Sequence, residues 1–143
     1  MDLIKLSANE ALKMMKEGTL SSEEYVKAFL KQIELRENEV GAWIFLDPKL
    51  ALDQAREADK RWKDKTAGKL NGLPIGIKDI IDTKDMPTEN GSQLCKDRKP
   101  SKDAHLVKLL RNEGAVILGK CVTTEFALSG PGKTKNPKDL ECT

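Results

Sequence analysis

Two apolar runs with a helical pattern between them constrain the fold more than any other feature of this sequence. They cover residues 73–81 and 115–119, and neither alternates apolar with polar side chains. Such runs are typical of strands that are covered on both faces of a sheet. Between them, Ser101 is the expected N-cap of a helix and Gly114 its natural end. Strand, helix and strand in this order predict a βαβ unit with parallel strands and a right-handed crossover. The side chains expected to face inward from the helix are Ala104, Leu106, Val107, Leu109 and Leu110.

Helices are also predicted before the first apolar run. Ser7 with Glu10, and Ser21 with Glu24, have the spacing of capping boxes. In a capping box the serine accepts from a backbone N–H group and the glutamate reaches back to the cap. The first of these helices should end at Gly18. The apolar face of the second, longer helix consists of Val26, Phe29, Leu30 and Ile33.

A third helix and the piece of chain before it complete the N-terminal part. Residues 41–46 form a short extended apolar piece, and Asp47 and Pro48 then open the helix as N-cap and first helical residue. Its thin apolar face consists of Ala51, Ala55, Ala58 and Trp62. We therefore expect an α/β fold with an N-terminal helical arm over residues 1–68 and the start of an α/β domain over residues 69–143. Because two strands alone do not make a stable parallel sheet, we interpret the domain as the incomplete opening part of a larger one.

Charge and cysteine content narrow the classes of function. The 25 basic and 23 acidic side chains give a net charge of +2, which offers no basic patch for nucleic acid or an anionic membrane. No apolar stretch approaches the roughly 18–20 residues that span a bilayer, and the N-terminus has no signal-peptide pattern. Three cysteines without a CxxC spacing and a single histidine argue against a disulfide framework and a zinc site. We expect a cytoplasmic protein that contacts neither membranes nor nucleic acid directly.

Lys78, near the end of the first apolar run, is the strongest candidate for chemistry. A lysine held partly out of water can accept a proton near neutral pH. Strand ends are also where open α/β sheets place their sites. The alternative is a lysine whose charged head simply reaches the surface.

Other candidates are weaker. Lys120 is interpreted as a structural or a surface lysine, and His105 as a solvent-exposed or packing histidine. Cys121 is interpreted as a small core residue. The GPGKT segment at 130–134 lacks the first glycine of a phosphate-binding loop and leads into no helix. The acidic residues after the first run are not spaced as a calcium loop and are interpreted as a solvated segment: Asp79, Asp82 and Asp85.

Several segments, in one order along the chain, resemble the amidase-signature family. The segment NGLPIGIKDIIDT at 71–83 is similar to that family's conserved-lysine segment, and MPTENGS at 86–92 to its next loop. GAVILGK at 114–120 resembles its following strand. TTEFA at 123–127 and GPGKTKNP at 130–137 resemble the approach to its Gly/Ser-rich signature. The similarity covers most of residues 70–140 and implies that the domain has a mixed sheet.

The resemblance implies amide hydrolysis through an acyl-enzyme. In that family a serine nucleophile is activated through a second serine, in a cis peptide bond, and a lysine that shuttles the proton. Only Lys78 matches a member of this Ser-cisSer-Lys triad, since Ser92, Ser101 and Ser129 match neither serine. The Gly/Ser-rich segment would begin just beyond Thr143, so we expect this 143-residue N-terminal portion to be inactive on its own. The resemblance implies no cofactor and no metal.

Three hypotheses for the function remain open at this stage. The first is a hydrolase of carbon–nitrogen bonds that takes a small-molecule amide substrate in its full-length parent. The second is the A subunit of a tRNA-dependent amidotransferase, which would work with partner subunits. The third is a truncated, non-catalytic remnant or binding module. A homodimer is compatible with the exposed sheet edges that the pattern predicts.

Overall fold

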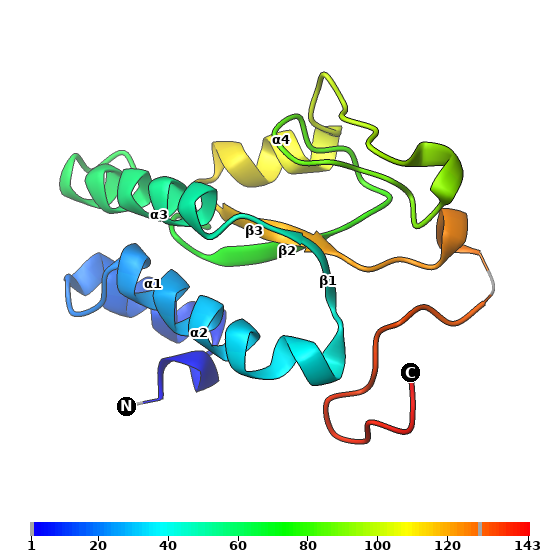
Figure 1. Cartoon of the computed structure of the whole chain (residues 1–143). Helices are drawn as coiled ribbons and strands as arrows, with labels where there is room; N and C mark the ends of the chain where they lie inside the picture. Colours follow the sequence, from blue (N-terminus) through cyan, green and yellow to red (C-terminus); the bar gives the residue numbers. More distant parts are fainter. Residues whose placement is uncertain (1, 129) are drawn as a thin grey trace. The chain divides into compact units, whose positions relative to one another are not determined.

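The computed structural model describes residues 2–128 and 130–143 and has an α/β architecture (Figure 1). Its helices are α1 (Ala8–Glu17), α2 (Ser22–Val40), α3 (Pro48–Lys63) and α4 (His105–Asn112). Its strands are β1 (Trp43–Leu46), β2 (Pro74–Lys78) and β3 (Val116–Cys121). Short 3-10 turns cover Leu3–Lys5, Gln93–Cys95 and Glu125–Ala127. The expected class, helices followed by the opening strands of a mixed sheet, is confirmed.

The three strands form one sheet in the order β1-β3-β2 (Figure 1). β1 runs antiparallel to β3, with an irregularity in register between Trp43 and Phe45. Backbone bonds join β2 and β3 in a parallel sense, since Val116 N–H donates to Leu73 O and Asp79 N–H donates to Cys121 O. The predicted parallel pair is therefore present, and the extended piece at 41–46 contributes the antiparallel edge strand.

Contacts divide the chain into two compact units that both draw on distant parts of the sequence. One unit contains Met1–Ile33, Asp47–Ile75 and Leu109–Leu118. The other contains Glu34–Leu46, Gly76–Lys108 and Gly119–Thr143. The predicted boundary between residues 68 and 69 stays a prediction.

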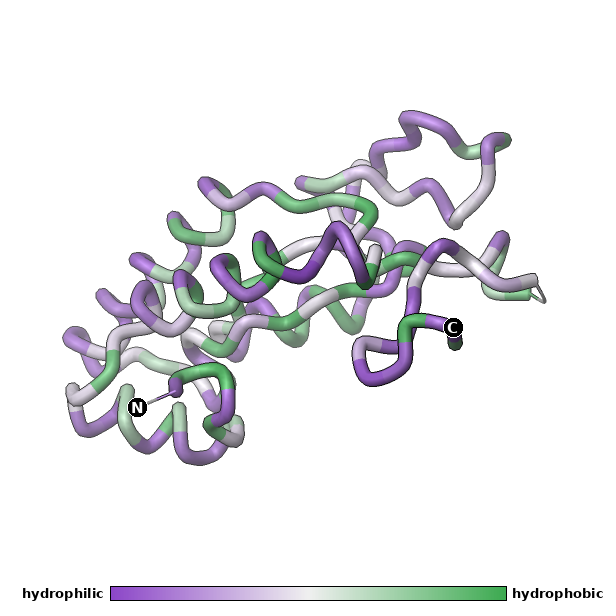
Figure 2. The backbone as a smooth tube through the Cα atoms, turned by 60° about the horizontal axis from the view of Figure 1, so that its bottom comes forward, coloured by the Kyte–Doolittle hydropathy of each residue, from purple (hydrophilic) through white to green (hydrophobic). Residues whose placement is uncertain are grey.

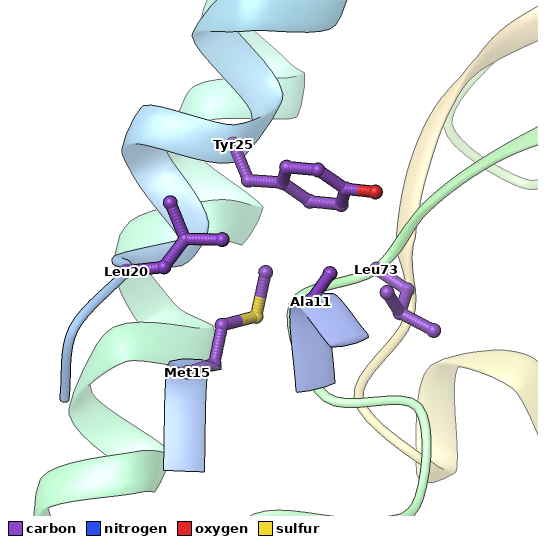
Figure 3. Close-up of a cluster of buried hydrophobic side chains, with 5 residues drawn as sticks. All are labelled: Ala11, Met15, Leu20, Tyr25 and Leu73. Atoms are coloured by element: carbon purple, nitrogen blue, oxygen red, sulfur yellow. The ribbon is translucent and has the colours of Figure 1, made fainter. Parts of the chain in front are cut away.

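A compact cluster of apolar side chains forms the core of the first unit (Figure 3). Ala11 and Met15 are one turn apart on α1, and Tyr25 on α2 and Leu73 before β2 pack with them. The ring of Phe29 meets that of Tyr25 edge-on, with 5.0 Å between centroids. This contact adds a directional aromatic interaction to simple burial.

The helix ends follow the sequence prediction closely. Ser7 and Glu10 form a complete capping box, and Gly18 ends α1 in the left-handed region at φ 74°. Asp47 caps α3, with Pro48 as its first residue. Ser21 and Glu24 also exchange their capping bonds.

The start of α2 has a second cap, supplied from far along the chain. The two oxygens of the Asp59 carboxylate on α3 accept from the backbone N–H groups of Ser22, at 2.6 Å, and Glu23, at 3.1 Å. The first N–H groups of a helix have no partner within the helix, so this carboxylate satisfies two of them.

Helix α4 departs from the prediction at its start and on its faces. It begins at His105 rather than directly after Ser101, which lies in a bend. Only Val107 is fully buried, whereas Leu106 and Leu109 are 51% and 49% exposed. Leu106 and Leu109 are three residues apart and therefore share one face of the helix. Val107 lies on a different face, which is the buried one.

Strand β2 also differs from expectation, whereas β3 agrees with it. Along β2 burial alternates: Ile77 is buried, but Gly76 and Lys78 are exposed. The prediction that this strand is covered on both faces is therefore wrong, because β2 is an edge strand with one covered face. β3 is the central strand and is buried on both faces from Val116 to Lys120.

Candidate functional site

Lys78 is the last residue of β2, and its side chain is exposed. The residues on either side of it, Ile77 and Asp79, are buried. Successive side chains of a strand point to opposite faces, so Lys78 leaves the sheet on the side away from these two. Among the residues that the structure describes, its amine has no hydrogen-bond or ion-pair partner.

A cavity of about 520 Å³ lies beside Lys78. Lys135, one of its lining residues, donates its backbone N–H to Val40 O at 2.8 Å, and the Thr134 hydroxyl donates to Gly41 O at 2.9 Å. These two bonds attach the C-terminal segment to the end of α2. The segment itself is mostly hydrophilic (Figure 2). The lining of the cavity combines apolar surface with hydroxyl, amine and amide side chains, from Lys78, Val122, Thr123, Thr124, Pro131, Gly132, Thr134, Lys135, Asn136 and Thr143.

No serine of the described chain is hydrogen-bonded to Lys78. Ser7 and Ser21 cap helices, and the buried Ser22 contacts the sulfur of Met15. Ser92 donates its hydroxyl to Glu125 at 2.6 Å, and Ser101 is exposed in a bend. Ser129 lies outside the described residues. Lys78 thus has no serine bonded to it in the described part of the chain.

The most unexpected part of the site is a buried ion pair next to Lys78. Lys120 on β3 is fully buried, and its amine lies 3.0 Å from Oδ1 of Asp79, which is 1% exposed. The same amine donates to Pro87 O at 3.0 Å and to the hydroxyl of Thr88. The Lys120 amine therefore makes two hydrogen bonds, and its contact with Asp79 is an ion pair without a hydrogen bond, because Asp79 Oδ1 accepts none. Of the two interpretations of Lys120, the structural one is correct, and the solvated interpretation of Asp79 is wrong.

Local sequence explains why the backbone can come together here. A Cβ at Gly119, just before Lys120, would lie 2.5 Å from Phe45 O, so the close approach of β1 requires glycine. Gly91 has φ +64°, and a Cβ there would lie 2.7 Å from Thr123 O. Glycine at both positions lets β1 and the loop after β2 pack against the end of β3.

Burial and charge act on Lys120 in opposite directions. Burial lowers the pKa of Lys120, because a low-dielectric surrounding disfavours the ammonium form, and Asp79 partly opposes this decrease. On the surface of the same loop, Arg98 forms a two-pronged ion pair with Asp82, at 2.7 and 2.9 Å. The Arg98 guanidinium lowers the pKa of the Asp82 carboxyl.

The remaining candidates have modest roles. His105 is exposed at the first turn of α4, as its solvent interpretation requires. Cys121 is half-buried, and burial raises the pKa of its thiol, which disfavours the reactive thiolate. Within residues 2–128 and 130–143, no three His, Cys, Asp or Glu side chains gather closely enough to hold a metal ion. Nor does this part of the chain contain a helix long and apolar enough to cross a bilayer.

Sequence reasoning did not identify the ion pair or the residues lining the cavity. One indication was available for the pair: Asp79 lies near the end of the first apolar run, Lys120 directly follows the second, and the two have opposite charges. For the cavity, the segments at 123–127 and 130–137 carried the family resemblance, and both contribute to its lining.

Comparison with known proteins establishes the family. The family model for amidases matches residues 24–143, and the chain therefore belongs to the amidase family. Among curated relatives, the A subunit of the glutamyl-tRNA(Gln) amidotransferase of Geobacter sp. (strain M21) is 36% identical over 149 residues. That match covers 100% of this chain and 31% of the relative. The chain thus spans about a third of the length of the curated relatives it matches.

Solved structures give the same assignment. The native peptide amidase from Stenotrophomonas maltophilia superposes with a TM-score of 0.80 and 33% identity, covering 85% of this chain and 26% of that one. A structure of fatty acid amide hydrolase superposes with a TM-score of 0.85 and 29% identity, covering 96% of this chain and 26% of that one. The fold described above is accordingly that of one part of an amidase-signature enzyme.

Proposed function

We propose that this chain is the lysine-bearing part of an enzyme that hydrolyses amide bonds, with Lys78 as the group that transfers protons. The observation that carries the proposal is the setting of Lys78. Its side chain is exposed, has no partner in the described part of the chain, and lines a cavity that offers both apolar surface and polar side chains. The surrounding segment is also the one that resembles the lysine segment of the family.

The resemblance supplies the reaction in which such a lysine would act. A neutral lysine amine accepts the proton of the serine nucleophile through the second serine, as the serine oxygen attacks the amide carbon. The same proton is then delivered to the leaving nitrogen, and water hydrolyses the acyl-enzyme. Catalytic groups that work as a unit depend strongly on one another, so we infer that the 143-residue chain alone hydrolyses no amide.

The relatives favour a second form of the same activity. The curated protein compared above is a subunit of a glutamyl-tRNA(Gln) amidotransferase, whereas the compared structures are a peptide amidase and a fatty acid amide hydrolase. In the first case the protein would act in the cytoplasm with partner subunits, and in the second it would act on a small-molecule amide as a monomer or homodimer. Co-purification of the tagged protein with other subunits from its own host would favour the amidotransferase.

The test is release of ammonia from a panel of amides, including glutamine, by the complete gene product. This product includes any residues encoded beyond Thr143. We expect activity in the complete product, loss of activity in Lys78→Ala, and none in the 143-residue chain. A complete, folded product without activity on any amide would contradict the proposal and favour a non-catalytic binding module. An active Lys78→Ala variant would contradict the role of Lys78.

A further inference from the structure

The buried pair of Lys120 and Asp79 has no place in the proton transfer just described. Lys120 is fully buried, its amine is bonded to Pro87 and Thr88 and paired with Asp79, and it does not line the cavity beside Lys78, so a substrate or a serine has no access to it. Yet Asp79, one member of the pair, directly follows Lys78 in the chain. A buried ion pair is a costly way to gain stability, since desolvating two charges offsets much of their attraction. Its position calls for another explanation.

We propose that the Lys120–Asp79 ion pair is a positioning device that fixes the direction in which the Lys78 side chain leaves β2. This inference rests on the proposed function, because it assigns the pair a task in the reaction of Lys78. Lys120 and Asp79 are positioning residues in this scheme and take no part in the chemical step.

Asp79 is held at four points. Its backbone N–H donates to Cys121 O at 2.9 Å, and its backbone oxygen accepts from Asn90 N–H at 3.0 Å. Its Oδ2 accepts from Glu89 N–H at 3.1 Å, and its Oδ1 meets Lys120. A residue hydrogen-bonded through its N–H, its C=O and Oδ2, and ion-paired through Oδ1, has very little rotational freedom. The backbone immediately after Lys78 is therefore rigid.

Lys120 joins this anchor to the loop that follows β2. Its bonds to Pro87 and Thr88 hold the loop, and the next residue, Glu89, donates back to the Asp79 carboxylate. The ammonium group thus closes a ring of contacts from β3 to the loop and back to the end of β2. Such a ring leaves one backbone direction at Lys78, on the face opposite the buried carboxylate.

Positioning of this kind has a recognisable kinetic effect. A catalytic group displaced by about 1 Å can lose about 100-fold in rate, even when the displacing change is remote from the chemistry. Substrate affinity need not change, because neither Lys120 nor Asp79 lines the cavity that holds Lys78. Loss of the pair should thus lower kcat and leave KM nearly unchanged.

The experiment uses the complete gene product and compares Lys120→Met with the double variant Asp79→Asn/Lys120→Met. The single variant leaves a buried carboxylate without its counter-ion and loses stability. The double variant removes both charges of the pair, so it should regain most of that stability. We still expect its kcat to be about 10- to 100-fold below wild type, with KM within about twofold. Lys108→Met removes an exposed lysine of α4 and should match wild type in both constants.

A second measurement follows the anchor without relying on activity. Hydrogen exchange of the Glu89 and Asn90 amides, which donate to Asp79, should be faster in the double variant than in wild type. Should the double variant fail to fold, Thr88→Val is a milder change that removes one acceptor of Lys120. Its kcat should fall about tenfold, and Thr88→Ser, which keeps the hydroxyl, should restore it.

The outcomes separate the two proposals. A double variant that is stable and has wild-type kcat, or unchanged exchange at Glu89 and Asn90, would overturn the positioning role and leave the proposed function intact. A wild-type product that hydrolyses no amide would overturn the proposed function and the positioning role with it. A stable double variant with reduced kcat, unchanged KM and faster exchange would support the inference.

Discussion

Lys78 and Lys120 lie at the ends of two neighbouring strands, yet their surroundings are opposite. Lys78 ends the edge strand β2, is exposed, and has no partner in the described chain. Lys120 lies near the end of the central strand β3, is fully buried, donates to Pro87 and Thr88, and forms an ion pair with Asp79. The difference comes from the loop after β2, which covers one lysine and leaves the other open.

The contrast teaches how one residue type can serve two purposes in one site. A lysine that must exchange protons needs an amine free of fixed partners. A lysine that holds a loop from a buried position needs a counter-ion and hydrogen-bond acceptors, since an unpaired buried charge would oppose folding. The experiments below ask whether these two lysines can be told apart by activity and by stability.

The largest effect is expected for activity at Lys78. Lys78→Met in the complete gene product should lower kcat/KM for an amide by about three orders of magnitude or more, because loss of a proton-transferring group removes both the base and the acid. Its free energy of unfolding should stay within about 0.5 kcal/mol of wild type, as for other surface changes. Steady-state kinetics and urea denaturation test both statements. A Lys78→Met variant as active as wild type would contradict the proposed role of Lys78 in proton transfer.

Stability should show the reverse order for the two lysines. Lys120→Met leaves the Asp79 carboxylate buried and unpaired, and should lower the free energy of unfolding by about 3–5 kcal/mol. Urea denaturation of this variant beside Lys78→Met gives a direct comparison. Equal midpoints for the two variants would mean that Lys120 contributes no more than a surface lysine.

A smaller effect is expected at the acceptor shared with the loop. Thr88→Val removes the hydroxyl that accepts from Lys120 and leaves one buried N–H without a partner. We expect a loss of about 1–3 kcal/mol, measured by the same denaturation. Thr88→Ser keeps the hydroxyl and serves as the matched control. A loss in Thr88→Ser as large as in Thr88→Val would assign the effect to the methyl group instead.

The smallest effect is expected for the exposed pair in the same loop. Arg98→Gln should cost at most about 1 kcal/mol at pH 7, because solvent and salt screen the Arg98–Asp82 pair. Arg98 lowers the pKa of Asp82, so the contribution is present above the ordinary aspartate range and is lost as pH falls through the lowered pKa. Wild type and Arg98→Gln should therefore converge in stability at acidic pH. A difference that grows on acidification would contradict this sign.

Much of the fold could be predicted because its determinants are local. Capping at Ser7, Ser21 and Asp47 depends on residues three positions apart, and the buried run at 115–119 has the composition of a central strand. The exposure of Leu106 and Leu109 could not be predicted in this way. It depends on which face of α4 the rest of the unit covers, and the apolar pattern alone is compatible with more than one face.

The candidate site shows the same division. Lys78 was found from its segment, but its cavity depends on residues more than forty positions later in the chain. The burial of Lys120 depends on a loop whose course no local pattern determines. Opposite charges at two strand ends were visible in the sequence, but a surface lysine and a solvated aspartate fitted that pattern equally well.

The long-range cap on α2 has a consequence for the order of folding. Ser22 and Glu23 take their acceptor from Asp59, which lies 37 and 36 residues away. The first turn of α2 therefore cannot be completed by neighbours in sequence alone, and closing so long a loop carries an entropic cost. Completion of the first turn of α2 and docking of α3 against it are therefore expected to occur together. In refolding, the first turn of α2 should become ordered only when α3 arrives.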